Sequence, residues 1–153
     1  MAVVFIGLGT NLGDRGANIE RAKKMLGRIP GLAVVRESSL EETRPVDVTD
    51  QPDFLNQVVM VETDMAPLEL LRHLRMIESA MGRVRTVPKG PRVIDLDILL
   101  YGDVMMKTSD LTIPHPRIKE REFVLRHLLE IDPELADPQT KQPYREVLLG
   151  WQR

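Results

Sequence analysis

The chain has 153 residues, of which 42% are hydrophobic and 29% charged, as expected for a soluble globular protein; we interpret residues 1–153 as a single domain. The net charge of −2 argues against a general nucleic-acid or membrane-surface binder, so any anion-binding site must be local. The absence of cysteine excludes disulfides and thiol chemistry and fits a reducing cytoplasm.

The first half of the chain predicts three strands and one helix. Residues 3–8 are an apolar run of strand length, too short for a signal peptide and without a basic leader. Turn residues follow, and then a helix whose apolar spacing ends at Pro30 and Gly31. Residues 32–39 and 54–63 are the next predicted strands. The long polar segment between them contains Thr43, and a loop of that length in a compact domain is usually functional.

The second half predicts two helices and two strands. Pro67 opens a helix whose core stripe is Leu70, Leu74, Ile77 and Met81. Residues 93–101 predict a strand, residues 111–113 a shorter strand, and residues 123–131 a third helix. No run approaches membrane-spanning length. Strands with interspersed helices favour an α+β sandwich of the ferredoxin-like kind.

Two carboxylates interrupt the otherwise aliphatic strand at residues 93–101. Because side chains alternate along a strand, Asp95 and Asp97 point together from one face. The opposite face is expected to hold Ile94, Leu96, Ile98 and Leu100. The two Cα atoms are about 6–7 Å apart, so both carboxylates reach one divalent cation or a close pair of cations. Alternatively, the pair lies on a solvated face of an edge strand or pairs with nearby arginines.

A basic segment precedes these carboxylates. It contains Arg83, Arg85, Lys89 and Arg92 and no acidic residue, and its glycines and prolines predict a loop. This arrangement suits a polyphosphate, because Mg²⁺ keeps few protein ligands and takes the rest from phosphate and water. We expect residues 83–92 to form a mobile lid that becomes ordered when a nucleotide binds.

Four motifs, in this order, resemble the 6-hydroxymethyl-7,8-dihydropterin pyrophosphokinase family. They are Gly-Thr-Asn-Leu-Gly at 9–13, Gln-Pro-Asp-Phe-Leu-Asn at 51–56, Gly-Pro-Arg-Val-Ile-Asp-Leu-Asp-Ile at 90–98, and Pro114-His115 with Arg121 and Phe123 downstream. The resemblance implies a three-layer α/β/α sandwich with a mostly antiparallel sheet flanked by helices, forming a single catalytic domain. It implies transfer of pyrophosphate from ATP to the pterin hydroxymethyl group, with release of AMP, in folate biosynthesis. Two Mg²⁺ ions, a cytoplasmic monomer, and no nucleic-acid or membrane partner are also expected.

The resemblance further implies a role for each matched position. Asp95 and Asp97 would bind the metal, and the residues acting in catalysis would be Arg83, Arg92 and Asp97. The pterin would be bound by Thr43, Val46, Phe54, Asn56, Asp95 and Phe123. ATP would be bound by Arg75, Glu78, Arg83, Arg92, Ile98, Thr112, His115 and Arg121.

Several of these positions also have a purely structural interpretation. Phe54 and Asn56 share a strand face and offer a flat apolar surface beside an amide. The alternative is that Phe54 and Phe123 are simply core residues. Spacing alone makes Glu78 a helix-surface carboxylate. Arg121 lies between two glutamates, as a solvated surface arginine would.

The sequence is also compatible with two other functional classes. Paired strand aspartates also occur in metal-dependent polymerase and nuclease-like domains, but these need a nucleic-acid track, and only residues 83–92 are basic here. A non-catalytic module that senses a metabolite is the other class, and ATP consumption that depends on a pterin would exclude it.

Overall fold

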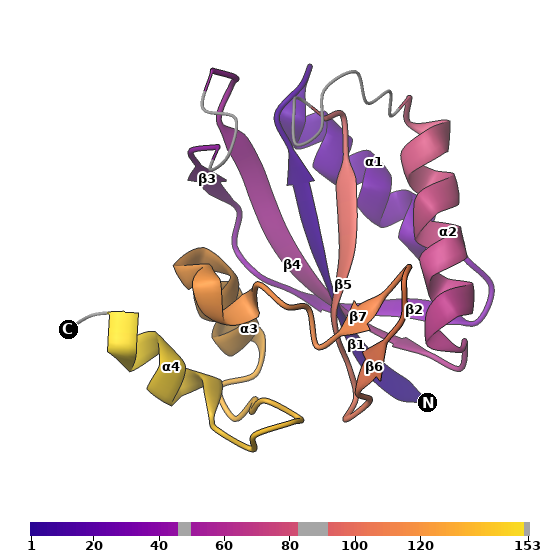
Figure 1. Cartoon of the computed structure of the whole chain (residues 1–153). Coiled ribbons are helices and arrows are strands. Elements are labelled where there is room, and N and C mark those ends of the chain that lie inside the picture. The colour runs from indigo at the N-terminus through magenta and orange to yellow at the C-terminus, as the bar shows by residue number, and fades with distance from the viewer. Residues whose placement is uncertain (46–49, 83–91, 152–153) are drawn as a thin grey trace.

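The structure is a computed structural model that describes residues 1–45, 50–82 and 92–151 (Figure 1). The strands are β1 (Ala2–Thr10), β2 (Leu32–Glu37), β3 (Glu41–Thr43), β4 (Phe54–Thr63), β5 (Asp95–Tyr101), β6 (Met106–Lys107) and β7 (Thr112–Ile113). The helices are α1 (Arg15–Gly27), α2 (Pro67–Ala80), the 3₁₀ turn η1 (Ile118–Glu120), α3 (Glu122–Ile131) and α4 (Tyr144–Trp151). No helix in the described ranges is long and apolar enough to cross a membrane.

The main sheet is antiparallel. Its strands follow the order β2-β4-β1-β5, and β3 pairs with β4, while β6 and β7 form a separate hairpin. The chain order β1, α1, β2, β4, α2, β5 on this sheet is the ferredoxin-like arrangement. The expected α+β class with an antiparallel sheet is therefore confirmed.

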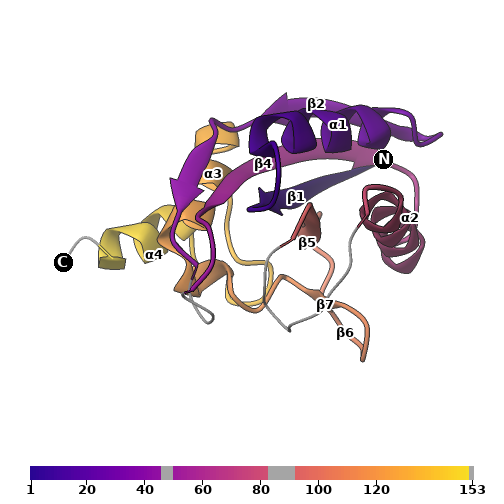
Figure 2. The ribbon, with the colours of Figure 1, turned by 90° about the horizontal axis from the view of Figure 1, so that it is seen from above.

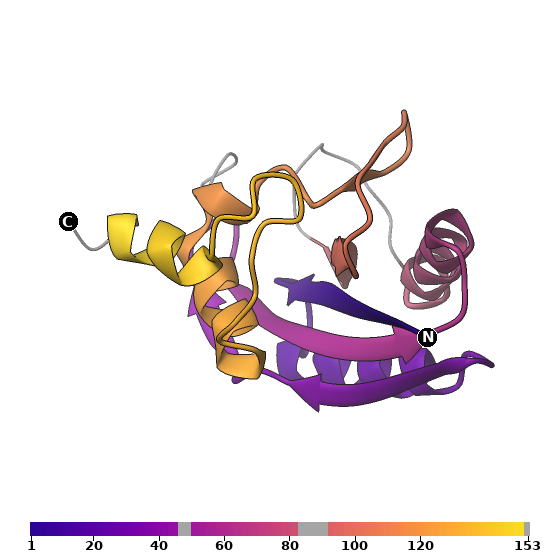
Figure 3. The same cartoon turned by 90° about the horizontal axis from the view of Figure 1, so that it is seen from below.

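Helices cover both faces of the sheet, which makes three layers. Along β1, Val4, Ile6 and Leu8 enter a core shared with α1 and α2, whereas Phe5 enters a second core shared with α3. Figures 2 and 3 show α1 against one side of the sheet and α3 on the opposite side. The helix α3 lies on the same face of the sheet as Asp95 and Asp97, and it packs on Leu99 and Leu100 of β5.

The strand β5 differs from the expected alternation at one residue. Phe5 pairs with Leu100 but Ile6 pairs with Ile98, so Leu99 is an extra residue on β5. A bulge of this kind moves the following side chains to the other face. Leu100 was expected beside Leu96 and Ile98, and that prediction was wrong: Leu99 and Leu100 both lie in the core under α3.

Most element boundaries agree with the sequence signals. Asp14 caps α1 by accepting a hydrogen bond from the backbone N–H of Ala17 at 3.1 Å, and α2 starts at Pro67 as expected. The strand β3 lies inside a segment that we expected to be a loop, and α4 was not expected. Val46, Arg83 and the proposed lid at 83–92, apart from Arg92, lie outside the described residues.

Candidate active site

A cavity of about 450 Å³ opens on the α3 face of the sheet. Its floor is formed by β1, β4 and β5, and its other walls come from residues 43–45, 115–117 and α3. The described residues that line it include Thr43, Phe54, Asn56, Arg92, Asp95, Asp97, His115, Arg121 and Phe123. The structure thus brings together nine of the residues that the sequence pointed to.

Two glycines leave space in the floor. Gly9 pairs with Asp95 and Gly7 with Asp97 across the β1–β5 ladder, and both glycines line the cavity. A Cβ atom on Gly9 would lie 3.4 Å from the Asn56 Oδ1 atom, and one on Gly7 would lie 3.5 Å from the Leu99 side chain. A Cβ atom would make ordinary contacts at both positions, and larger side chains would extend into the cavity beside the carboxylates.

Asp95 and Asp97 both project into this cavity. Burial, and after it the charge of the neighbouring Asp95 carboxylate, raises the pKa of Asp97 to about 7. Arg92 Nη1 lies 3.6 Å from Asp95 Oδ2, so the alternative that the pair contacts a nearby arginine holds for Asp95. Two adjacent carboxylates, one of them destabilised in its charged form, have the donor chemistry of a divalent-cation site.

An aromatic slot with an amide at its end lies beside the carboxylates. Phe54 and Asn56 project from β4 and Phe123 from α3, all lining the cavity. The guanidinium carbon of Arg92 is 5.6 Å from the centre of the Phe54 ring, within cation–π range. Asn56 Nδ2 donates to the carbonyl of Glu41 at 3.2 Å and to Thr43 Oγ1 at 2.7 Å. Its Oδ1 atom is thereby oriented as a hydrogen-bond acceptor for a ligand.

His115 and Arg121 place nitrogen donors at the same cavity. Burial, and after it the positive charges of Arg121 and Arg117, lowers the pKa of His115 to about 4, so the imidazole is neutral at pH 7. His115 Nδ1 accepts a hydrogen bond from the backbone N–H of Arg117 at 3.2 Å, which leaves Nε2 as the protonated nitrogen. A neutral donor beside arginines suits a phosphate oxygen.

Four described residues that were expected to bind the nucleotide do not line this cavity: Arg75, Glu78, Ile98 and Thr112. Thr112 lines a neighbouring cavity of about 680 Å³ beside β6 and β7, and His115 lines both cavities. The Ile98 side chain is buried in the core, so only its backbone is available to a ligand. Glu78 is 1% exposed, so the surface interpretation was wrong: with Arg75 it bonds the backbone of Leu96.

Asn11 explains the first of the four motifs. This buried side chain accepts from the backbone N–H of Arg92 at 2.8 Å, and its Nδ2 donates to Gln51 Oε1 and to the Pro52 carbonyl, both at 2.9 Å. Asn11 thereby joins two segments that flank the cavity. The sequence shows the motif but not these partners, which lie about 40 and 80 residues away.

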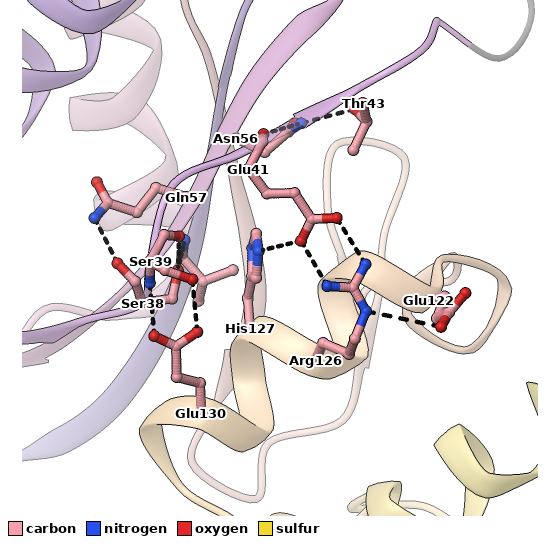
Figure 4. Close-up of polar contacts among 11 residues, drawn as sticks. Ser38, Ser39, Glu41, Thr43, Asn56, Gln57, Glu122, Arg126, His127 and Glu130 are labelled. Carbon is pink, nitrogen blue, oxygen red and sulfur yellow. Dashed lines mark hydrogen bonds and ion pairs between the residues drawn. The ribbon is translucent and has the colours of Figure 1, made fainter. Parts of the chain in front are cut away.

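Sequence reasoning missed three residues around the slot. Glu41 contacts Arg126 and His127 of α3, and His127 lines the cavity (Figure 4). Arg126 and His127 stand in an ordinary amphipathic helix, and Glu41 stands in a polar stretch, so no local pattern links them. Only the pairing of β3 with β4 brings them together.

Comparison with known proteins supports one family. Residues 5–133 match the sequence model of 7,8-dihydro-6-hydroxymethylpterin-pyrophosphokinase (HPPK). The chain is 48% identical over 146 residues to the folic acid synthesis protein fol1 of Schizosaccharomyces pombe, covering 95% of this chain and 20% of that protein. It is 43% identical over 129 residues to the 2-amino-4-hydroxy-6-hydroxymethyldihydropteridine pyrophosphokinase of Bacillus subtilis, covering 84% of this chain and 77% of that protein.

Solved structures share the fold at lower sequence identity. A crystal structure of wild-type Plasmodium falciparum HPPK-DHPS superimposes with a TM-score of 0.77 at 16% identity, covering 98% of this chain and 44% of that chain. The chain thus spans less than half of that protein, and a fifth of the yeast relative. With a match over most of its length and the four motifs in place, this chain belongs to the 7,8-dihydro-6-hydroxymethylpterin-pyrophosphokinase (HPPK) family.

Proposed function

We propose that the protein transfers pyrophosphate from ATP to 6-hydroxymethyl-7,8-dihydropterin, giving the pterin diphosphate and AMP in folate biosynthesis. One observation carries the proposal: a carboxylate pair and an aromatic slot with an oriented amide lie in one cavity of a chain from this family. In the transfer, the pterin hydroxyl oxygen bonds to the β-phosphorus. The bond from the β-phosphorus to its bridging oxygen on the α-phosphate breaks, and the hydroxyl proton passes to solvent.

The slot is suited to a flat heterocycle. Phe54 and Phe123 would pack against the two faces of the pterin ring, which buries apolar surface. Asn56 Oδ1 would accept a hydrogen bond from a ring-edge N–H. These contacts would hold the hydroxymethyl group towards Asp95 and Asp97, and orientation of this kind is a large part of phosphoryl-transfer catalysis.

The carboxylate pair would hold two Mg²⁺ ions together with ATP. Bound Mg²⁺ would neutralise phosphate charge and polarise the pterin hydroxyl. Arg92, Arg121 and Arg83 would supply further positive charge to the phosphates, and His115 would donate from Nε2. Thr112, Arg75, Glu78 and the Ile98 backbone would lie towards the nucleotide, and Val46 would complete the pterin site.

The remaining expectations are part of the same proposal. We propose that residues 1–153 act as one catalytic domain, as a monomer in the cytoplasm. The substrates are small molecules, which fits a net charge of −2 and the local clustering of cationic side chains at one cavity.

The test is product identification. The protein is incubated with ATP, Mg²⁺ and the hydroxymethyl-dihydropterin, and the nucleotides are separated by chromatography. AMP that forms only when the pterin is present supports the proposal. ADP as the product, or ATP that is consumed equally without pterin, contradicts it, and pterin binding without turnover would indicate a sensing module.

A further inference from the structure

Glu41 connects two elements that form opposite sides of the aromatic slot. Its Oε1 and Oε2 atoms accept from Arg126 Nη1 and Nη2 at 2.6 and 2.7 Å, and Oε1 also lies 2.9 Å from His127 Nε2 (Figure 4). Glu41 lies in β3, and both partners lie in α3. The contact is therefore a three-bond tie between the strand side of the slot and its helix side.

On the strand side, Glu41 is directly linked to Asn56. The two residues face each other in the β3–β4 ladder, and Asn56 Nδ2 donates to the Glu41 carbonyl at 3.2 Å. Thr43, two residues further along β3, accepts from the same nitrogen at 2.7 Å. Any shift of β3 therefore turns the Asn56 amide and moves Thr43, which also lines the cavity.

On the helix side, Glu41 is linked to Phe123 through His127. The His127 side chain is 2% exposed, and its ring contacts the Phe123 ring edge to face, with the centres 6.1 Å apart. Burial lowers the pKa of His127, so the ring is neutral and its Nε2–H donates to the Glu41 carboxylate. His127 and Phe123 both line the cavity.

We propose that Glu41 is a positioning residue that sets the width of the aromatic slot and the orientation of the Asn56 amide. The inference rests on the proposed function, because it assumes that the slot holds the pterin. An unbroken series of contacts runs from Asn56 through Glu41 and His127 to Phe123, so the two sides of the slot are held in register.

The partial exposure of the Glu41–Arg126 ion pair indicates that it positions the slot more than it stabilises the fold. The side chains of Glu41 and Arg126 are 28% and 40% exposed, and partly exposed ion pairs add little to stability. A bidentate carboxylate–guanidinium pair nevertheless fixes geometry, since both partners are planar. Losing it is therefore expected to change ligand binding more than folding.

A second tie in the same region serves as a matched control. Glu130, on α3, accepts from the Ser39 backbone N–H at 2.8 Å and from Ser39 Oγ at 2.9 Å, just before β3 (Figure 4). It joins the same two parts of the fold, but it does not line the cavity. Glu130→Gln thus removes a comparable charge without altering the contacts of Asn56 or Phe123.

The experiment measures binding by titration calorimetry for the unchanged protein, Glu41→Gln, Arg126→Lys and Glu130→Gln. The ligands are the hydroxymethyl-dihydropterin and, separately, a non-hydrolysable ATP analogue with Mg²⁺. For Glu41→Gln and Arg126→Lys, we expect the pterin dissociation constant to rise about tenfold, as for a displaced binding group. The analogue should bind within about twofold of its original affinity, because the side-chain partners of Glu41 and Arg126 are not among the residues assigned to the nucleotide.

Each outcome decides the inference. Glu130→Gln is expected to bind pterin as the unchanged protein does. Unaltered pterin affinity in both Glu41→Gln and Arg126→Lys, or an equal loss in Glu130→Gln, would overturn the positioning role while leaving the proposed function in place. An unchanged protein that binds no pterin would overturn both. If Glu41→Gln does not fold, the charge-conserving Arg126→Lys variant, which loses the bidentate geometry, decides the result.

Discussion

The carboxylate of Glu78 accepts a hydrogen bond from the backbone N–H of Leu96 at 2.8 Å. The Leu96 carbonyl accepts in turn from Arg75 Nη1 at 2.9 Å, and the same nitrogen lies 2.9 Å from Glu78 Oε1. β5 is the edge strand of the main sheet, so side chains of α2 take the place of a neighbouring strand at this residue. Because Leu96 separates Asp95 from Asp97, this contact fixes the backbone that carries the carboxylate pair.

Replacing Glu78 by alanine should therefore destabilise the protein. The change leaves the buried Leu96 N–H without its acceptor and removes a partner of Arg75, at a cost of about 3 kcal/mol in the free energy of unfolding. Glu78→Gln keeps an acceptor of the same shape and should lose less. Urea unfolding measures both, with Glu69→Gln on the exposed surface of α2 as the control. A loss no greater than that of the control would show that the contact does not hold β5.

Glu78 also shows where sequence reasoning reached its limit. Helical periodicity made it a surface carboxylate, which is wrong, because periodicity does not reveal that α2 packs beside a strand at the edge of the sheet, whose backbone groups accept side-chain partners. The bulge at Leu99 was likewise invisible, because apolar residues fill both faces of β5 there. Asp95 and Asp97 were predictable because charges on an aliphatic strand need a specific reason.

The sequence also did not reveal which side chains far apart in the chain contact each other. Glu41 stands 85 residues from Arg126, and a three-residue strand has too few positions for a recognisable alternation. The slot residues Phe54 and Asn56 were found because two positions of one predicted strand share a face. Their true neighbours depend on how β3 and α3 fold over that face.

Asp97 predicts an unusual pH dependence for the metal-free protein. Its pKa in the fold is about 7, above the ordinary value of 3.8, so the folded state binds this proton more tightly than the unfolded state. The free energy of unfolding contributed by Asp97 therefore falls as the pH rises from about 4 to about 7, and stays low above that. Asp97→Asn should remove this fall.

The measurement is urea unfolding between about pH 4 and about pH 8, which covers the interval from the ordinary to the raised pKa of Asp97, with a chelator present. The prediction concerns the difference in the free energy of unfolding between the unchanged protein and Asp97→Asn at each pH. Contributions of carboxylates that are the same in both proteins cancel in this difference. Asp103→Asn, at an exposed aspartate, is the control. A difference that does not vary with pH would mean that Asp97 is ionised in the folded protein throughout this range.

Asn56→Ala should weaken pterin binding more than nucleotide binding. The substitution removes the oriented Oδ1 acceptor and leaves a ligand N–H unpaired, at a cost of roughly 1–3 kcal/mol. Phe54→Ala and Phe123→Ala should act in the same direction through lost stacking area. Titration with pterin and with an ATP analogue separates the two effects, and Gln142→Ala, at an exposed residue that lines neither cavity, is the control. Unchanged pterin affinity in all three variants would place the pterin elsewhere.

Asp95 and Asp97 are the residues whose substitution is expected to reduce turnover most. Asp95→Asn and Asp97→Asn keep the size of each side chain but remove the charge that would hold Mg²⁺, so each should lower kcat by at least about 10³-fold while the fold is retained. Circular dichroism and the unfolding midpoint check the fold. Near-normal Mg²⁺-dependent turnover in either variant would contradict the metal assignment.

The most direct test follows the phosphorus atoms themselves. The unchanged protein and Asp97→Asn are each mixed with ATP, Mg²⁺ and the hydroxymethyl-dihydropterin, and the products are followed by ³¹P NMR. The account predicts AMP and a pterin diphosphate in equal amounts from the unchanged protein, and neither from the variant. ADP with a pterin monophosphate, or equal amounts of product from the two proteins, would contradict it.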